Sequence, residues 1–219
     1  MLSRPMIDRI AFFGISWYAI LIVSSILIGL AYCNHESRRR GLPQDTMIDF
    51  LLYAIPLAII CARLYYVVFR FNMYSEDILS VLNLREGGLA IYGGIIGGLI
   101  AAKITARKHD IPILTLLDVV APALVLGQAI GRWGNYINME AYGLRIAQPY
   151  LQFFPFAVEI PVGDVWYWHM ATFFYEFCWN MLVFVLLLCV RRAQKARRYF
   201  LLVSAALLRR PHSDRRSAL

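Results

Sequence analysis

The sequence predicts an all-α membrane protein, a polytopic helix bundle with at least five spanning helices and an outer-facing polar site. Of the 219 residues, 60% are hydrophobic and only 16% are charged, and the charges gather in clumps between long apolar runs. Five runs approach the roughly 20 residues that a helix needs to cross the hydrocarbon core. We therefore expect residues 1–219 to form one integral membrane domain.

Each expected span is bounded by charged residues or by proline and glycine. The first run is longer than the apolar part of a signal peptide and lacks a small-residue cleavage site near its end, so we expect it to remain as a spanning helix. A later run, 199–208, would rise only about 15 Å as a helix, half of the hydrocarbon thickness, and is expected not to span. The spans are residues 12–33, 47–69, 89–106, 112–131 and 170–190.

The charges of the loops predict the orientation. The loops after the first, third and fifth spans are rich in arginine and lysine, which is typical of the cytoplasmic side. The stretches 70–88 and 132–169 together carry four arginines against six carboxylates, so these stretches and the amino terminus should face outward. The same rule explains the net charge of +8, and no nucleic-acid partner is expected.

With this orientation, the polar side chains within the spans converge at the outer end of the bundle. Part of this set could be structural, for example an ion pair between Arg63 and Glu176, because charges in lipid need partners. Asp49 and Asp118 lie near the inner ends of their spans and are expected to serve capping or packing. The outer set comprises Tyr18, Arg63, Tyr92, Arg132, Asn135, Tyr175 and Glu176.

Glycines four residues apart mark the third and fourth spans as places where another backbone can approach closely. If these two faces meet, Tyr92 would lie alongside Arg132 at the outer boundary. The motif also occurs where it marks helix packing alone, so both interpretations stay open. The pairs are Gly93 with Gly97, Gly94 with Gly98, and Gly127 with Gly131.

At the end of the fourth span, apolar residues give way to an arginine, two asparagines and a glutamate separated by glycines. Arg132 and Asn135 are three residues apart and share a face if the helix continues, which offers a forked cation and an amide to one ligand. An isolated arginine here could instead only reach lipid headgroups. The string over 127–143 reads GQAIGRWGNYINMEAYG.

This string resembles the signature of prolipoprotein diacylglyceryl transferases, integral membrane enzymes of bacteria, which runs Gly-Arg-x-Gly-Asn-Phe-Ile-Asn-x-Glu-x-x-Gly. Tyr136 replaces the phenylalanine, and Tyr92 before Gly93 and Gly94 resembles the second motif of the family in its tyrosine form. After the fifth span the family has a further spanning helix with an arginine, which has no secure counterpart here; we expect a shortened or altered carboxyl terminus. Weaker similarities lie at Trp17-Tyr18, at 62–67, and at His169 with 171–176, so that the resemblance covers roughly 14–190.

The resemblance implies that the chain moves a diacylglyceryl group from phosphatidylglycerol to the lipobox cysteine of prolipoprotein signal peptides, forming a thioether and releasing glycerol phosphate. It also implies a location in the bacterial cytoplasmic (inner) membrane, in contact with membrane lipid. The expected catalytic residues are Tyr92, Arg132, Asn135 and Glu140. The expected substrate-binding residues are Tyr18, Arg63, Gly93, Gly94, Asn138, Gly143 and Glu176.

This displacement at a glycerol carbon requires that the phosphate leaving group be neutralised and that the sulfur be a thiolate. Arg132 suits the first requirement, because a guanidinium is permanently charged and grips phosphate through two N–H groups. Asn135 would hold a phosphate or glycerol oxygen, while Glu140 could orient Arg132 or bind the glycerol hydroxyls. Tyr92 is the candidate for deprotonating the thiol or donating to the phosphate.

No metal or cofactor is expected, because the reaction needs none and the four cysteines lack CxxC spacing. Two alternatives remain open. A non-catalytic lipid-binding or small transporter-like membrane protein would use the same outer residues without chemistry, although no internal inverted repeat supports transport. An inactive truncated relative of the enzyme is favoured only by the altered carboxyl terminus.

Overall fold

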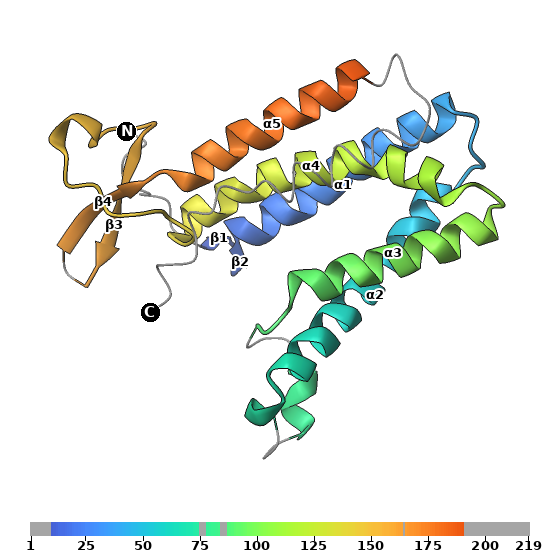
Figure 1. Cartoon of the computed structure of the whole chain (residues 1–219), viewed down its shortest axis with the longest axis horizontal. Coiled ribbons are helices and arrows are strands. Elements are labelled where there is room, and N and C mark those ends of the chain that lie inside the picture. Colours follow the sequence, from blue (N-terminus) through green and yellow to red (C-terminus); the bar gives the residue numbers. More distant parts are fainter. Residues whose placement is uncertain (1–9, 75–77, 84–86, 164, 191–219) are drawn as a thin grey trace. The chain divides into compact units, whose positions relative to one another are not determined.

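Helices dominate the chain in the computed structural model, which describes residues 10–74, 78–83, 87–163 and 165–190 (Figure 1). The expected run 199–208 lies outside these residues. The α-helices are α1 (Trp17–Arg39), α2 (Thr46–Phe69), α3 (Ile91–Lys108), α4 (Ile113–Asn138) and α5 (Thr172–Val190). Shorter elements are η1 (Phe71–Met73), η2 (Ile78–Leu82), η4 (Pro149–Leu151), and the strands β1 (Ile10–Phe12), β2 (Ile15–Ser16), β3 (Ala157–Val162) and β4 (Val165–Met170).

Four helices of the described part, α1, α2, α4 and α5, are long and apolar enough to cross a membrane. This confirms a mostly helical membrane protein. α3 falls outside that group, because Lys103, Arg107 and Lys108 lie in its last two turns. The helix expected at 112–131 continues to Asn138, so the polar motif begins inside α4 rather than after it.

The prediction of an all-α chain missed two small antiparallel hairpins, β1–β2 and β3–β4. The second lies within the stretch 132–169 that was expected to be an outer loop. Its strands pair in register from Ala157 opposite Met170 to Val162 opposite Val165, and Gly163, with a φ of +63°, lies in the turn. These strands were missed because they are short, and their period-2 pattern is weak compared with that of the much longer apolar runs.

The chain divides into two compact units, one formed by residues 1–32 and 120–219 and the other by residues 33–119. In the first unit, α1, α4 and α5 run alongside one another (Figure 1). Ala121 and Val125 of α4 pack with Val183 and Leu187 of α5 in one buried cluster. The expectation of one membrane domain over 1–219 stays a prediction.

A second buried cluster joins the end of α4 to the β3–β4 hairpin and the first turn of α5. Tyr136 stacks on Phe173, with ring centroids 4.6 Å apart. Val158 and Ile160 of β3 belong to the same cluster, and both side chains are buried. Aromatic stacking and apolar burial therefore hold the last turns of α4, which carry the polar motif, against a rigid support.

In the other unit, α2 and α3 lie side by side along a glycine face (Figure 1). A Cβ at Gly93 would lie 2.6 Å from the Cα of Ala62, and a Cβ at Gly97 would lie 2.7 Å from the Cα of Ala58. The small-residue face of α3 therefore meets α2. A meeting with the fourth span was only one possibility and stays a prediction, because the motif specifies a close approach and leaves the partner open.

Gly97→Ala is expected to lower the free energy of unfolding by about 1–3 kcal/mol, because the new methyl group would overlap the α2 backbone. Gly98→Ala is the matched control, since a Cβ there meets nothing within 4 Å. Thermal unfolding in detergent micelles measures the difference. Equal unfolding midpoints for Gly97→Ala and Gly98→Ala would show that α2 and α3 can move apart to fit the methyl group without loss of stability.

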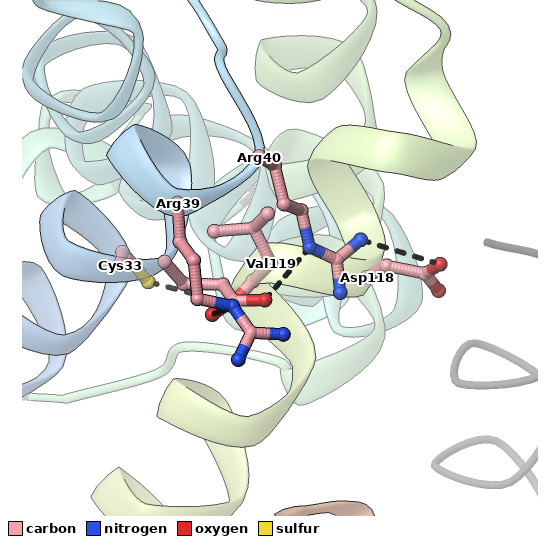
Figure 2. Close-up of polar contacts among 6 residues, drawn as sticks. Cys33, Arg39, Arg40, Asp118 and Val119 are labelled. Atoms are coloured by element: carbon pink, nitrogen blue, oxygen red, sulfur yellow. Dashed lines mark hydrogen bonds and ion pairs between the residues drawn. The ribbon is translucent and has the colours of Figure 1, made fainter. Parts of the chain in front are cut away.

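A buried polar cluster joins the end of α1 to the beginning of α4 within the second unit (Figure 2). Arg40 donates to the Glu36 carboxylate at 2.8 Å, and one of its terminal nitrogens lies 3.9 Å from Asp118. The side chains of Glu36 and Asp118 are almost fully buried. Asp118 is thus a packing group, as expected, and Asp49 similarly contacts Lys108 at 2.8 Å.

Candidate active site

The polar motif of α4 begins with an ion pair. Arg132 contacts the carboxylate of Glu176, which lies in the second turn of α5, and both side chains are largely buried. A buried arginine requires such a partner, because an unpaired charge away from water is costly. The ion pair suggested for Arg63 and Glu176 is replaced by this one.

Three residues later on the same helix face, Asn135 takes part in an amide–carboxylate cluster. The Glu140 Oε1 atom accepts a hydrogen bond from Asn135 Nδ2 at 3.1 Å and another from Asn138 Nδ2 at 3.2 Å. Glu140 therefore orients the two asparagine amides, whereas the sequence indicated Arg132 or the glycerol hydroxyls as its partners. Each amide uses one of its Nδ2 N–H groups in the hydrogen bond to Glu140. The carbonyl oxygen and the second N–H of each amide face other directions.

The backbone around Glu140 has an uncommon conformation. The residues on either side, Met139 and Ala141, have φ values of +54° and +51°. This is the left-handed region, which residues other than glycine rarely adopt. The Glu140 N–H donates to the carbonyl of Asn135 at 3.0 Å, and the Thr172 hydroxyl donates to the carbonyl of Ala141. Such strain is typical of functional sites, where surrounding contacts hold the backbone in place.

Two motif glycines make room for neighbouring groups. A Cβ at Gly134 would lie 2.5 Å from a ring carbon of Tyr18, so the tyrosine ring packs directly on the α4 backbone. A Cβ at Gly143 would lie 2.7 Å from the Thr172 methyl group, and the Gly143 N–H donates to the carbonyl of Met170 at 3.1 Å. Tyr18 and Gly143 thus support the motif by packing.

The remaining predicted site residues belong to the unit formed by 33–119. Tyr92 is 69% exposed, with its ring 6.1 Å from that of Tyr65. Gly93 packs against α2, whereas a Cβ at Gly94 would meet nothing within 4 Å. Arg63 is only 6% exposed, and its guanidinium donates to backbone carbonyls of η2 and of the segment that connects η2 to α3.

Sequence reasoning placed Tyr175 in the outer polar set but did not find how it and Thr172 support the site. Thr172 and Tyr175 of α5 donate to the carbonyls of Ala141 and Phe156, which ties the turn and the hairpin to α5. The left-handed residues beside Glu140 carry no sequence signal, since neither is glycine or asparagine. Among the residues that the structure describes, no group of three or more His, Cys, Asp or Glu side chains could hold a metal ion.

The chain is similar to one protein family and to several proteins of known name. The family model described as prolipoprotein diacylglyceryl transferase matches residues 5–209. A phosphatidylglycerol–prolipoprotein diacylglyceryl transferase of Halalkalibacterium halodurans is 44% identical over 188 residues, which cover 84% of this chain and 65% of the relative. Proteins of the same name from Bacillus cytotoxicus and Bacillus cereus strain Q1 are 41% and 39% identical over 202 residues. These alignments cover 89% of this chain and 74% of each Bacillus protein, so the chain spans about two thirds to three quarters of its relatives.

Proposed function

The chain belongs to the prolipoprotein diacylglyceryl transferase family, and we propose that it transfers the diacylglyceryl group of phosphatidylglycerol to the lipobox cysteine of prolipoproteins. The names of the relatives support phosphatidylglycerol and a prolipoprotein as the two substrates. The single observation that carries the proposal is a partly buried arginine, held by Glu176, with an asparagine one turn later on the same helix. This pairing suits a phosphodiester.

In the proposed reaction, the cysteine sulfur attacks the glycerol carbon that bears the phosphate. A carbon–sulfur bond forms, the carbon–oxygen bond to phosphate breaks, and glycerol phosphate leaves with the electron pair. The thiol proton passes to a base, for which the resemblance to the family gives Tyr92 in its deprotonated phenolate form as the candidate. No redox change occurs, and every atom is supplied by the two substrates.

Arg132 stabilises the charge that develops on the leaving phosphate. Its ion pair with Glu176 holds the guanidinium in one orientation before the lipid binds, which reduces the entropy lost on binding. Glu140 does the same for Asn135 through the hydrogen bond at 3.1 Å. Both groups are therefore preorganised for an anionic ligand, and electrostatic stabilisation is strongest when the donors need not move.

The proposal places these groups at the outer face of the bacterial cytoplasmic membrane, with α3 as a fifth span in addition to the four apolar helices. Distribution of basic residues among the loops supports this orientation. An exported prolipoprotein presents its lipobox cysteine on that side. The charge distribution is accounted for by topology, so the proposal includes no nucleic-acid partner.

Mass spectrometry of a lipobox peptide tests the function. Purified protein in phosphatidylglycerol-containing nanodiscs should add the mass of one diacylglyceryl group to the peptide cysteine, and a peptide with serine in place of cysteine should stay unmodified. Binding of phosphatidylglycerol without any change in peptide mass would identify a lipid-binding protein instead of an enzyme.

The orientation gives a separate prediction. In a cysteine-free background, Ala147→Cys should react with a membrane-impermeant maleimide added to intact cells, because it lies in the proposed outer segment. Arg107→Cys, near the end of α3, should react only after the membrane is opened. Both residues are exposed, so accessibility differs by membrane side alone. The reverse labelling pattern would place the Arg132 motif on the cytoplasmic side.

A further inference from the structure

The guanidinium of Arg63 is enclosed by backbone carbonyls. Its three nitrogens make five hydrogen bonds, a number equal to the N–H groups that arginine has. The Tyr74 ring lies 5.1 Å from the guanidinium carbon and adds a cation–π contact. The acceptors are the carbonyls of Ser80 at 2.8 Å, Val81 at 2.7 Å, Asn83 at 3.0 Å, Gly87 at 2.8 Å and Gly88 at 3.2 Å.

Gly87 and Gly88 have the backbone conformation that this arrangement requires. Their φ values of +80° and +73° direct two successive carbonyls to the same terminal nitrogen of Arg63. A Cβ at Gly88 would lie 2.5 Å from that nitrogen and 2.9 Å from the Tyr66 ring. Glycine at 88 is therefore needed both for the conformation and for the space.

The carbonyl cage lies directly before α3. The Ala90 N–H donates to the carbonyl of Ala62 at 3.0 Å, next to Arg63, and α3 begins at the following residue. Tyr92 is the second residue of α3 and four residues beyond Gly88. The contacts of Arg63 thus fix the backbone from which Tyr92 projects.

We propose that Arg63 is a positioning residue that acts through Tyr92, and that it organises the connection between α2 and α3 rather than binding the lipid phosphate. Its five donors already have acceptors, so a phosphate could bind only by displacing part of the cage. Only arginine offers five N–H groups in one plane, whereas lysine offers three from a single atom. The expected effect on turnover depends on the proposed transferase function, while the effect on the connection itself does not.

Hydrogen exchange in the absence of substrate tests the cage directly. Arg63→Lys should increase the exchange rate of the Ala90 amide, which donates to the carbonyl of Ala62 at 3.0 Å, at least about tenfold, because the local structure opens more often. Arg70→Lys is the matched control, since Arg70 is an exposed arginine at the end of the same helix, and its exchange pattern should be that of the parent protein. Unchanged exchange in Arg63→Lys would overturn the proposal.

Gly88→Ala keeps an arginine at position 63 and perturbs the cage at the carbonyl side, because the new methyl group would lie 2.5 Å from the Arg63 terminal nitrogen. It should reproduce the faster exchange of the Ala90 amide, so the proposal stays testable if Arg63→Lys does not fold. Parental exchange in Gly88→Ala would likewise contradict the cage.

Kinetics separate positioning from substrate binding. Arg63→Lys should lower kcat about tenfold or more and leave KM for phosphatidylglycerol within about twofold. In a Tyr92→Phe background the same substitution should have almost no further effect, because both changes act on one group. A large rise in KM, or a full effect in the Tyr92→Phe background, would assign Arg63 to the lipid. If the parent protein shows no diacylglyceryl transfer but Arg63→Lys still shows faster hydrogen exchange, the transferase function is refuted and the cage proposal is supported.

Discussion

Arg132→Lys is expected to lower kcat/KM for diacylglyceryl transfer about 10²–10³-fold, nearly as much as Arg132→Ala. Lysine retains the positive charge and loses the planar fork that binds Glu176 and a phosphate at the same time. A single ammonium group could not bind the Glu176 carboxylate and the lipid phosphate with the geometry that the two edges of a guanidinium allow. The measurement is the initial rate of lipobox peptide modification at several phosphatidylglycerol concentrations.

Arg145→Lys provides the control for this substitution. Arg145 lies in the same proposed outer segment, with its guanidinium 3.7 Å from the centroid of the Tyr167 ring, and has no role in the proposed chemistry. Its conversion to lysine should change the rate less than about threefold. If Arg132→Lys kept as much activity as Arg145→Lys, Arg132 would supply charge alone, and the bidentate role would be wrong.

Asn135→Asp should lower kcat/KM about 10³-fold, the other large effect. The substitution replaces an N–H donor with a carboxylate close to Glu140, whose Oε1 atom lies 3.1 Å from the present amide nitrogen. It also introduces negative charge where the proposed mechanism places a phosphate. Both changes oppose binding of an anion and stabilisation of its transition state.

Asn138→Asp separates these two causes, because it breaks an equivalent hydrogen bond to the same Glu140 oxygen, at 3.2 Å. If Asn135 contacts the substrate, Asn135→Asp should be the more damaging by about tenfold or more. Equal losses in kcat/KM for the two variants would contradict a phosphate-binding role that distinguishes Asn135 from Asn138. Phosphatidylglycerol binding to each variant, measured in nanodiscs, shows whether the difference arises in binding or in turnover.

The sequence was sufficient to predict the helices, because apolar length and clustered charge are properties of single segments. It also predicted that Arg132 and Asn135 share one helix face, since α4 continues to Asn138 and the helical repeat then determines their relation. The family signature identified the same stretch independently. These features depend on local periodicity, which one sequence contains in full.

Features that depend on tertiary partners were less predictable. The spacing of Gly93 and Gly97 showed that a backbone approaches α3, while the identity of α2 as partner came only from the structure. Arg63 was grouped with Glu176 by depth, yet its acceptors are carbonyls, and backbone acceptors have no side-chain signature. The left-handed turn around Glu140 is similarly hidden, because its neighbours are methionine and alanine.

The buried cluster of Glu36, Arg40 and Asp118 has a consequence for biosynthesis in the membrane. Glu36 and Arg40 lie four residues apart at the end of α1, so this pair can form as soon as the first span has been made. Asp118 reaches Arg40 only after the ribosome has produced α4. Until then, or in any chain where α1 and α4 meet out of register, a carboxylate near the apolar part of α4 lacks this arginine, which costs several kcal/mol. We therefore expect this ion pair to favour the correct alignment of α1 with α4 during membrane insertion.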